Sequence, residues 1–76
     1  MPMAFVLINT ETGSESKVLA ALKRIDAVTE AFMVYGVYDV VVKVRADTME
    51  KLKEIVTYQV RHLDKVGTTT TMLVIE

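Results

Sequence analysis

Cysteine and tryptophan are missing from this sequence of 76 residues, and histidine occurs once. Without cysteine the chain has no disulfide and no thiol nucleophile, and a single histidine does not make a structural zinc site. A serine or threonine nucleophile would need an activating base, and His62 is the sole histidine that can supply one. The sequence therefore predicts that the protein is not an enzyme and holds no metal and no cofactor.

An excess of positive charge and a long hydrophobic run are missing too. Nine basic and ten acidic residues give a net charge of −1, whereas a lone nucleic-acid-binding domain carries a basic excess that neutralises phosphates. The longest apolar runs, residues 4–8 and 31–35, are far shorter than the roughly 20 residues of a membrane span. No secretory leader opens the chain. We expect a cytoplasmic protein with no direct nucleic-acid partner and no membrane partner.

What the chain does have is a high apolar content, with hydrophobic residues at 51%. So short a chain buries only a small core, and small domains usually need a disulfide, a metal or self-association to be stable. Because the first two are excluded here, self-association remains. The composition therefore predicts a homo-oligomer.

Four stretches rich in apolar and β-branched residues predict strands at residues 4–9, 28–35, 38–45 and 68–75. Apolar residues at helical spacing predict one helix over 15–25, between the first two strands, and another over 48–63, between the last two. The side chains expected to face the core are Val18, Leu19, Leu22 and Ile25 of the first helix and Leu52, Ile55, Val56, Val60 and Leu63 of the second.

Polar residues mark where both helices begin. Thr12 and Glu15 fit a capping box at the start of the first helix, with Ser14 as the alternative cap. Asp47 with Glu50 offers the same reciprocal arrangement at the start of the second. Both helices are therefore expected to begin close to these residues.

A short internal repeat relates the two halves of the chain. The segment RIDAV at residues 24–28 resembles HLDKV at residues 62–66, and each lies where a helix ends and a strand begins. Two such β-α-β units joined by a hairpin make a ferredoxin-like βαββαβ plait. The predicted fold is thus α+β, a single domain over residues 1–76, with a four-stranded antiparallel sheet and two helices on one face.

The other face of this sheet is also apolar. The first strand alternates Ala4, Val6 and Ile8 with Phe5 and Leu7, so both of its sides are hydrophobic. Two helices on one face cannot cover the opposite face. A large exposed apolar surface marks an interaction site, and we therefore expect another copy of the molecule to cover it.

Two segments are candidates for ligand binding. In the hairpin of residues 35–39, Gly36 and Val37 form a two-residue turn that fits type II′, between Tyr35 and Tyr38. Asp39 has poor strand propensity yet opens a valine-rich strand, where its carboxylate suits an ammonium group. The threonines at residues 68–71 offer hydroxyl donors on both faces of the sheet. A tight turn and a half-exposed edge strand are the plainer interpretations of these segments.

These residues resemble a known family. Gly36-x-Tyr38-Asp39 heading a valine-rich strand, the segment LDxVxxTxT at residues 63–71 and the opening INTETG at residues 8–13 are together similar to the effector-binding domain of the Lrp/AsnC transcription regulators. The resemblance covers nearly the whole chain and implies a stand-alone effector domain without the helix-turn-helix. The family often has proline and a basic residue at positions 12 and 70, where this chain has threonine.

The resemblance implies dimers formed through the sheets and rings of dimers, octamers or decamers, with an amino acid effector bound between dimers. Carried over to this chain, the ligand would lie near Gly36, Tyr38 and Asp39, with Thr69 and Thr71 contributed by the last strand of a subunit that the resemblance does not specify. It further implies regulation of transcription through a DNA-binding member of the family.

Three other functions are compatible with the same plait. An ACT-like domain regulating a metabolic enzyme would place its ligand near Gly13, in the first strand-helix loop. An acylphosphatase would use Asn9, but no arginine precedes the first helix to cradle a phosphate. An RRM-like RNA-binding domain would need aromatic residues in the RNP pattern, which the sequence lacks.

Overall fold

The computed structural model describes residues 1–75, in which strands and helices follow one another in the order βαββαβ. The strands are β1 (Met3–Thr10), β2 (Val28–Met33), β3 (Val40–Arg45) and β4 (Val66–Leu73). The helices are α1 (Glu15–Lys23) and α2 (Met49–Ile55), and α2 continues into a π-helical segment, η1 (Val56–Val60). Every predicted strand and helix is present.

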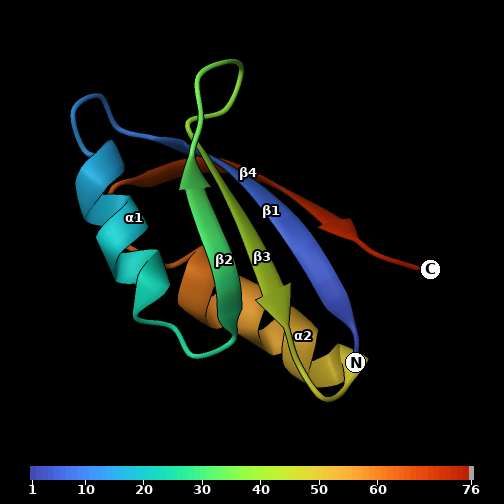
Figure 1. Ribbon diagram of the computed structural model, residues 1–76. Coiled ribbons are helices and arrows are strands. Elements are labelled where there is room, and N and C mark those ends of the chain that lie inside the picture. Colours follow the sequence, from blue (N-terminus) through green and yellow to red (C-terminus); the bar gives the residue numbers. More distant parts are fainter. Residues whose placement is uncertain (76) are drawn as a thin grey trace.

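The strands form one four-stranded antiparallel sheet in the order β2-β3-β1-β4. The first strands of the two β-α-β units, β1 and β3, lie side by side at its centre, and β2 and β4 form its edges (Figure 1). Both helices pack their apolar side chains into one core on a single face of the sheet. The fold is the ferredoxin-like plait predicted from the sequence.

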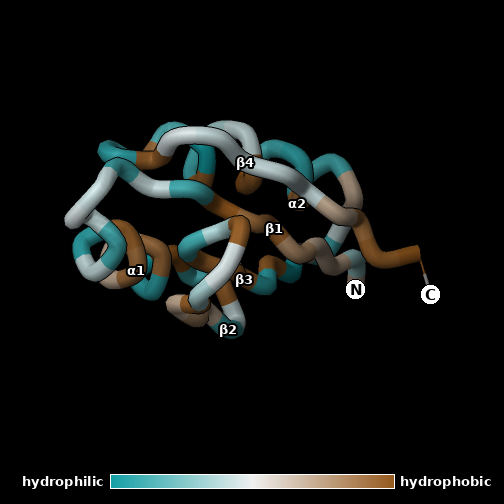
Figure 2. Tube along the Cα trace, turned by 90° about the horizontal axis from the view of Figure 1, so that it is seen from above, coloured by the Kyte–Doolittle hydropathy of each residue, from teal (hydrophilic) through white to brown (hydrophobic). Residues whose placement is uncertain are grey.

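The core lies between the sheet and the helices. All of the helix side chains predicted to face it either belong to the buried cluster or pack against it. Alternate residues of the central strands point into the same layer, and their exposed fraction is zero. They are Ala4, Val6 and Ile8 of β1 and Val40, Val42 and Val44 of β3. Figure 2 shows the contrast with β4, whose threonines make it a pale tube of intermediate hydropathy beside the browner β1.

The internal repeat corresponds to a real structural equivalence. At the first junction the N–H of Ile25 donates to Leu22 (3.1 Å) and that of Val28 donates to Ile25 (3.0 Å). At the second, Leu63 donates to Val60 and Val66 donates to Leu63, both at 3.4 Å. The aliphatic residue of each segment packs on the core, and each final valine begins a strand. The same turn therefore joins helix to strand in both halves.

The second helix is not the continuous α-helix predicted over 48–63, because its last turn widens into η1. Leu52, Val56 and Val60 all point into the core. An α-helix has about 3.6 residues per turn, so side chains four apart drift around its axis. A wider π turn counteracts this drift and keeps Val60 buried. Such segments are rare and often lie at functional sites.

Both predicted helix caps need correction. Ser14, the alternative, occupies the N-cap position of α1, and its side chain makes no capping bond; Glu15 instead accepts the N–H of Gly13 (2.9 Å). At α2 the cap is Thr48 rather than Asp47, because the Thr48 hydroxyl accepts the N–H of Lys51 (3.1 Å). Two neighbouring residues with capping side chains make such a choice undecidable from sequence.

The Thr48 cap leads to a stability prediction. Thr48→Ala leaves the Lys51 N–H without its acceptor and should lower the free energy of unfolding by about 1 kcal/mol. Asp47→Ala should lower it by less, since Asp47 makes no capping bond in residues 1–75. Urea unfolding of both variants measures the difference. A larger loss for Asp47→Ala would contradict the assignment.

The prediction of a two-residue hairpin turn at Gly36 and Val37 is also wrong. Strand β2 ends at Met33 and β3 begins at Val40, and the N–H of Val34 donates to the Asp39 carbonyl at 2.8 Å. Four residues, 35–38, lie outside this bond, so the loop is wider than a type II′ turn. Gly36 does not adopt the left-handed conformation that such a turn requires of it. Figure 1 shows the loop projecting past the end of the sheet.

A bulge interrupts the pairing of β1 with β4. Ile8 pairs with Thr69, but Thr10 pairs with Val66, so β4 has one extra residue between these pairs. Gly67 makes the bulge sterically feasible, because a Cβ there would lie 3.1 Å from the Asn9 carbonyl oxygen. Beyond the bulge the side chains of β4 alternate regularly between the two faces.

Candidate functional site

The sheet face opposite the helices is open and largely apolar. In the strand register Leu7 lies between Val41 and Thr70, and Phe5 lies between Lys43 and Met72. At one edge Phe32 pairs with Val41 and is 54% exposed, and at the other Met72 is 47% exposed. This open face consists of Phe5, Leu7, Glu30, Phe32, Val41, Lys43, Thr70 and Met72. The prediction that the sheet is apolar on both faces is therefore confirmed for β1, while Lys43 of the central strand β3 and Glu30 of the edge strand β2 make the open face mixed on their side of β1.

Asp39 connects the hairpin to the end of β1. Its Oδ2 accepts the N–H of Thr10 at 2.9 Å and the Thr10 hydroxyl at 3.4 Å. Its own N–H donates to the Ile8 carbonyl at 2.9 Å. These bonds give Asp39 a structural role that explains an aspartate at the head of a valine-rich strand. Among residues 1–75 no donor reaches its second oxygen, Oδ1, which leaves one carboxylate oxygen for a ligand.

Tyr38 crosses to the last strand. Its hydroxyl forms a hydrogen bond of 2.8 Å with the Thr70 hydroxyl. Nearby, the Asn9 side-chain amide donates to the Thr68 hydroxyl at 3.0 Å. Loop, β1 and β4 thus present hydroxyl, amide and carboxylate groups at one end of the open face.

The threonines are divided between the two faces. Thr69 pairs with Ile8 and Thr71 pairs with Val6, and both of these partners are buried under the helices. Thr69 and Thr71 therefore lie on the helix face, while Thr70 lies on the open face. Within one chain the structure brings Tyr38 and Asp39 together but places Thr69 and Thr71 on the opposite side of the sheet.

The two loop glycines, Gly13 and Gly36, differ in whether their backbone conformation requires glycine. Gly13 has a φ of +82°, a conformation that a side chain rarely adopts. Gly36 has an ordinary φ, and a Cβ there would meet no atom within 4 Å. The backbone therefore explains Gly13, the residue that an ACT-like site would use. Neither the backbone nor the neighbouring atoms within the described residues require glycine at position 36.

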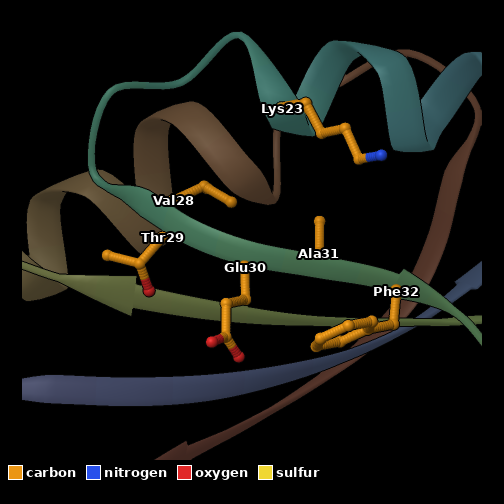
Figure 3. A pocket seen from close by; sticks show the side chains of 6 residues that line it. All are labelled: Lys23, Val28, Thr29, Glu30, Ala31 and Phe32. Atoms are coloured by element: carbon orange, nitrogen blue, oxygen red, sulfur yellow. The ribbon is translucent and has the colours of Figure 1, made fainter.

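One surface hollow lies along β2 and measures about 320 Å³. Figure 3 shows that its lining side chains diverge: Lys23, Val28 and Ala31 lie on the helix side of the strand, and Glu30 and Phe32 point the other way. Groups on opposite sides of a strand do not converge on one ligand. This hollow is therefore a poor candidate for a binding site.

Another hollow, of about 240 Å³, lies between the second helix and β4. We call it the α2–β4 groove, and it is lined by Lys53, Val56, Thr57, Arg61, Thr71 and Leu73. Thr71 was predicted as a site residue, whereas Lys53 and Arg61 were not among the predicted site residues. The signal that sequence reasoning missed is the four-residue spacing of Lys53, Thr57 and Arg61, which places them on one side of a helix.

Two other kinds of site find no support in residues 1–75. No group of three or more metal-ligating side chains lies together there. In the same part of the chain, no helix has the length and apolar character needed to cross a membrane.

Comparison with known proteins gives a consistent picture. The family model described as the Lrp/AsnC ligand binding domain matches residues 3–76. The crystal structure of FFRP-DM1 is similar at 39% identity, with a TM-score of 0.94, 99% of this chain covered and 100% of that one. A hypothetical protein, PHS023 from Pyrococcus horikoshii, is similar at 38% identity, with a TM-score of 0.93 and coverage of 100% and 92%.

Escherichia coli AsnC is a longer protein. It is similar at 25% identity with a TM-score of 0.90, and the match covers 99% of this chain but 51% of AsnC. No match was found among curated proteins.

Proposed function

Because this chain belongs to the Lrp/AsnC ligand-binding domain family, we propose that it is an amino-acid-sensing module whose ligand controls how its subunits assemble. The role involves no chemical step: the protein binds, and its oligomeric state changes. In this proposal the chain acts as a stand-alone effector domain. It regulates transcription by assembling with a DNA-binding member of the family rather than by contacting DNA.

The observation that carries the proposal is the open face. Phe5, Leu7 and Val41 lie side by side at its centre with no helix over them. An apolar surface of this kind is stabilised when a second copy covers it. We propose that two sheets pack face to face in a dimer and that dimers close into a ring of eight or ten subunits.

The proposed ligand site lies at the end of this face. Asp39 Oδ1 would accept the ligand ammonium, with the Tyr38 hydroxyl and the backbone at Gly36 beside it. Thr69 and Thr71 face the other way in the same chain, so they would be supplied by a neighbouring subunit. A site divided between subunits couples binding to assembly, since a ligand favours whichever oligomer completes its pocket.

A thermal unfolding scan against the twenty amino acids tests this function. A ligand at about 100 times its Kd stabilises the folded protein by about 2.7 kcal/mol, which should raise the Tm by roughly 15 °C. Size-exclusion chromatography of the same samples should show a larger species with the effective amino acid and not with its D-enantiomer. If none of the twenty changes the Tm at millimolar concentration, the protein is not an amino acid sensor.

A further inference from the structure

The α2–β4 groove has a charge that the rest of the chain does not share. Its lining contains two cations, Lys53 and Arg61, and no acidic residue, although the whole chain has a net charge of −1. The single ion pair within residues 1–75 joins Lys65 to Glu11, and neither of these residues lines the groove. The two cations of the groove are thus not neutralised by a carboxylate of the described chain.

The other lining groups define what an anion in the groove would contact. The hydroxyls of Thr57 and Thr71 can each donate a hydrogen bond to an oxyanion. Val56, at 5% exposure, and Leu73 supply an apolar wall. The groups come from two elements, the second helix and the edge strand β4, so the fold has to be intact for them to meet.

The π-helical turn helps to bring these groups together. Lys53 lies in α2, Thr57 lies within η1 and Arg61 is its C-cap, so the three are spaced by four residues across the change of helix type. In an unbroken α-helix this stripe would drift around the axis, as the buried stripe of Leu52, Val56 and Val60 would. The wide turn that keeps Val60 in the core therefore also keeps Arg61 over the groove.

We propose that the α2–β4 groove binds the carboxylate of a small aliphatic acid. Arg61 and Lys53 pair with the carboxylate, Arg61 being able to do so in a bidentate manner. Thr57 and Thr71 donate to its oxygens, and Val56 with Leu73 contacts a short hydrocarbon chain. With no acidic group in the lining, the groove has nothing to hold an ammonium, so an acid without an amino group binds here as well as an amino acid does.

This inference deepens the proposed function, since Thr71 belongs to both sites. The carboxylate groove of one subunit and the ammonium-binding end of another, with Tyr38 and Asp39, would complete one amino acid pocket. An acid lacking the amino group uses the groove alone. The two proposals can therefore fail separately.

The test uses the full chain and 2-oxoisovalerate, a branched acid with no amino group, followed by ¹H–¹⁵N NMR. Amide shifts should be confined to residues 53–61 and 71–73, with a Kd in the millimolar range or tighter. Acetate, which lacks the hydrocarbon chain, should bind more weakly. Arg61→Gln and Lys53→Gln should each weaken 2-oxoisovalerate binding about tenfold, the scale of one charged hydrogen-bonded contact.

The matched control is Lys51→Gln, an exposed lysine of the same helix that does not line the groove. It should bind the acid as tightly as the unaltered chain. Equal weakening by Lys51→Gln would mean general attraction of anions and would overturn the site, as would the absence of any shift at tens of millimolar acid. If 2-oxoisovalerate binds and no amino acid changes the Tm, the groove stands and the sensing function falls.

Discussion

A Leu7→Lys variant is expected to be monomeric at micromolar concentration, where the unaltered protein is expected to form dimers through its open face. Leu7 lies in a central strand between Val41 and Thr70, so its side chain would be near the middle of a face-to-face dimer. An uncompensated charge buried in an interface costs about 3–5 kcal/mol, which raises the dimer Kd by roughly 10²-fold or more.

The variant should still fold as a monomer. Leu7 is half-buried, so the aliphatic stem of a lysine can lie along the sheet while its ammonium reaches water. Tyr58→Lys is the matched control, because Tyr58 is a large exposed side chain of η1, outside the sheet. Sedimentation velocity should find this control dimeric. A dimeric Leu7→Lys protein, or an unaltered protein that is already monomeric, would remove the intersubunit site and with it the sensing mechanism.

Asp39→Ala is expected to lower the free energy of unfolding by about 2 kcal/mol and the Tm by roughly 10 °C. The partly buried N–H of Thr10 would lose its acceptor, and the hairpin would lose its side-chain link to β1. Thermal and urea unfolding measure the loss. An Asp39→Ala protein as stable as the original would show that the Thr10 bonds contribute nothing to stability.

Asp39→Asn separates this structural role from the proposed ligand role. The asparagine carbonyl still accepts the Thr10 N–H, so most of the stability should remain. The negative charge that would pair with a ligand ammonium is gone, so the rise in Tm caused by the effective amino acid should disappear. If the full rise persists in Asp39→Asn, Asp39 does not bind the ligand.

The fold was accessible from the sequence because its main determinants are periodic. Alternation in β3 and helical spacing around Leu22 and Leu52 identify the core directly, and the repeated junction segment relates the two halves. The sequence could not decide which of two nearby residues makes a given contact when both side chains have suitable acceptor groups. Thr48 rather than Asp47 caps α2 because its hydroxyl lies within reach of Lys51. The wider hairpin is closed by the backbone bond from Val34 to Asp39, and Asp39 also accepts a hydrogen bond from Thr10, which is distant in sequence.

The candidate site was only partly accessible. Tyr38 and Asp39 were predicted as site residues from their place at the head of a strand; both make hydrogen bonds there within the chain, and their ligand role stays a prediction. The sequence did not predict on which face of the sheet each threonine lies, because this depends on the position of the bulge near Gly67. Arg61 was missed because the groove is formed only when the helix packs beside β4. On the helix alone Arg61 is a solvent-exposed side chain, and β4 supplies the other side of the groove.

The bulge at Gly67 determines which side chains of β4 lie on which face of the sheet. Side chains on a strand exchange faces with every shift of one residue, and β4 has no fully buried side chain that would resist such a shift. Deleting a single residue there would turn Thr69 and Thr71 outward and Thr70 inward, with the central valines untouched.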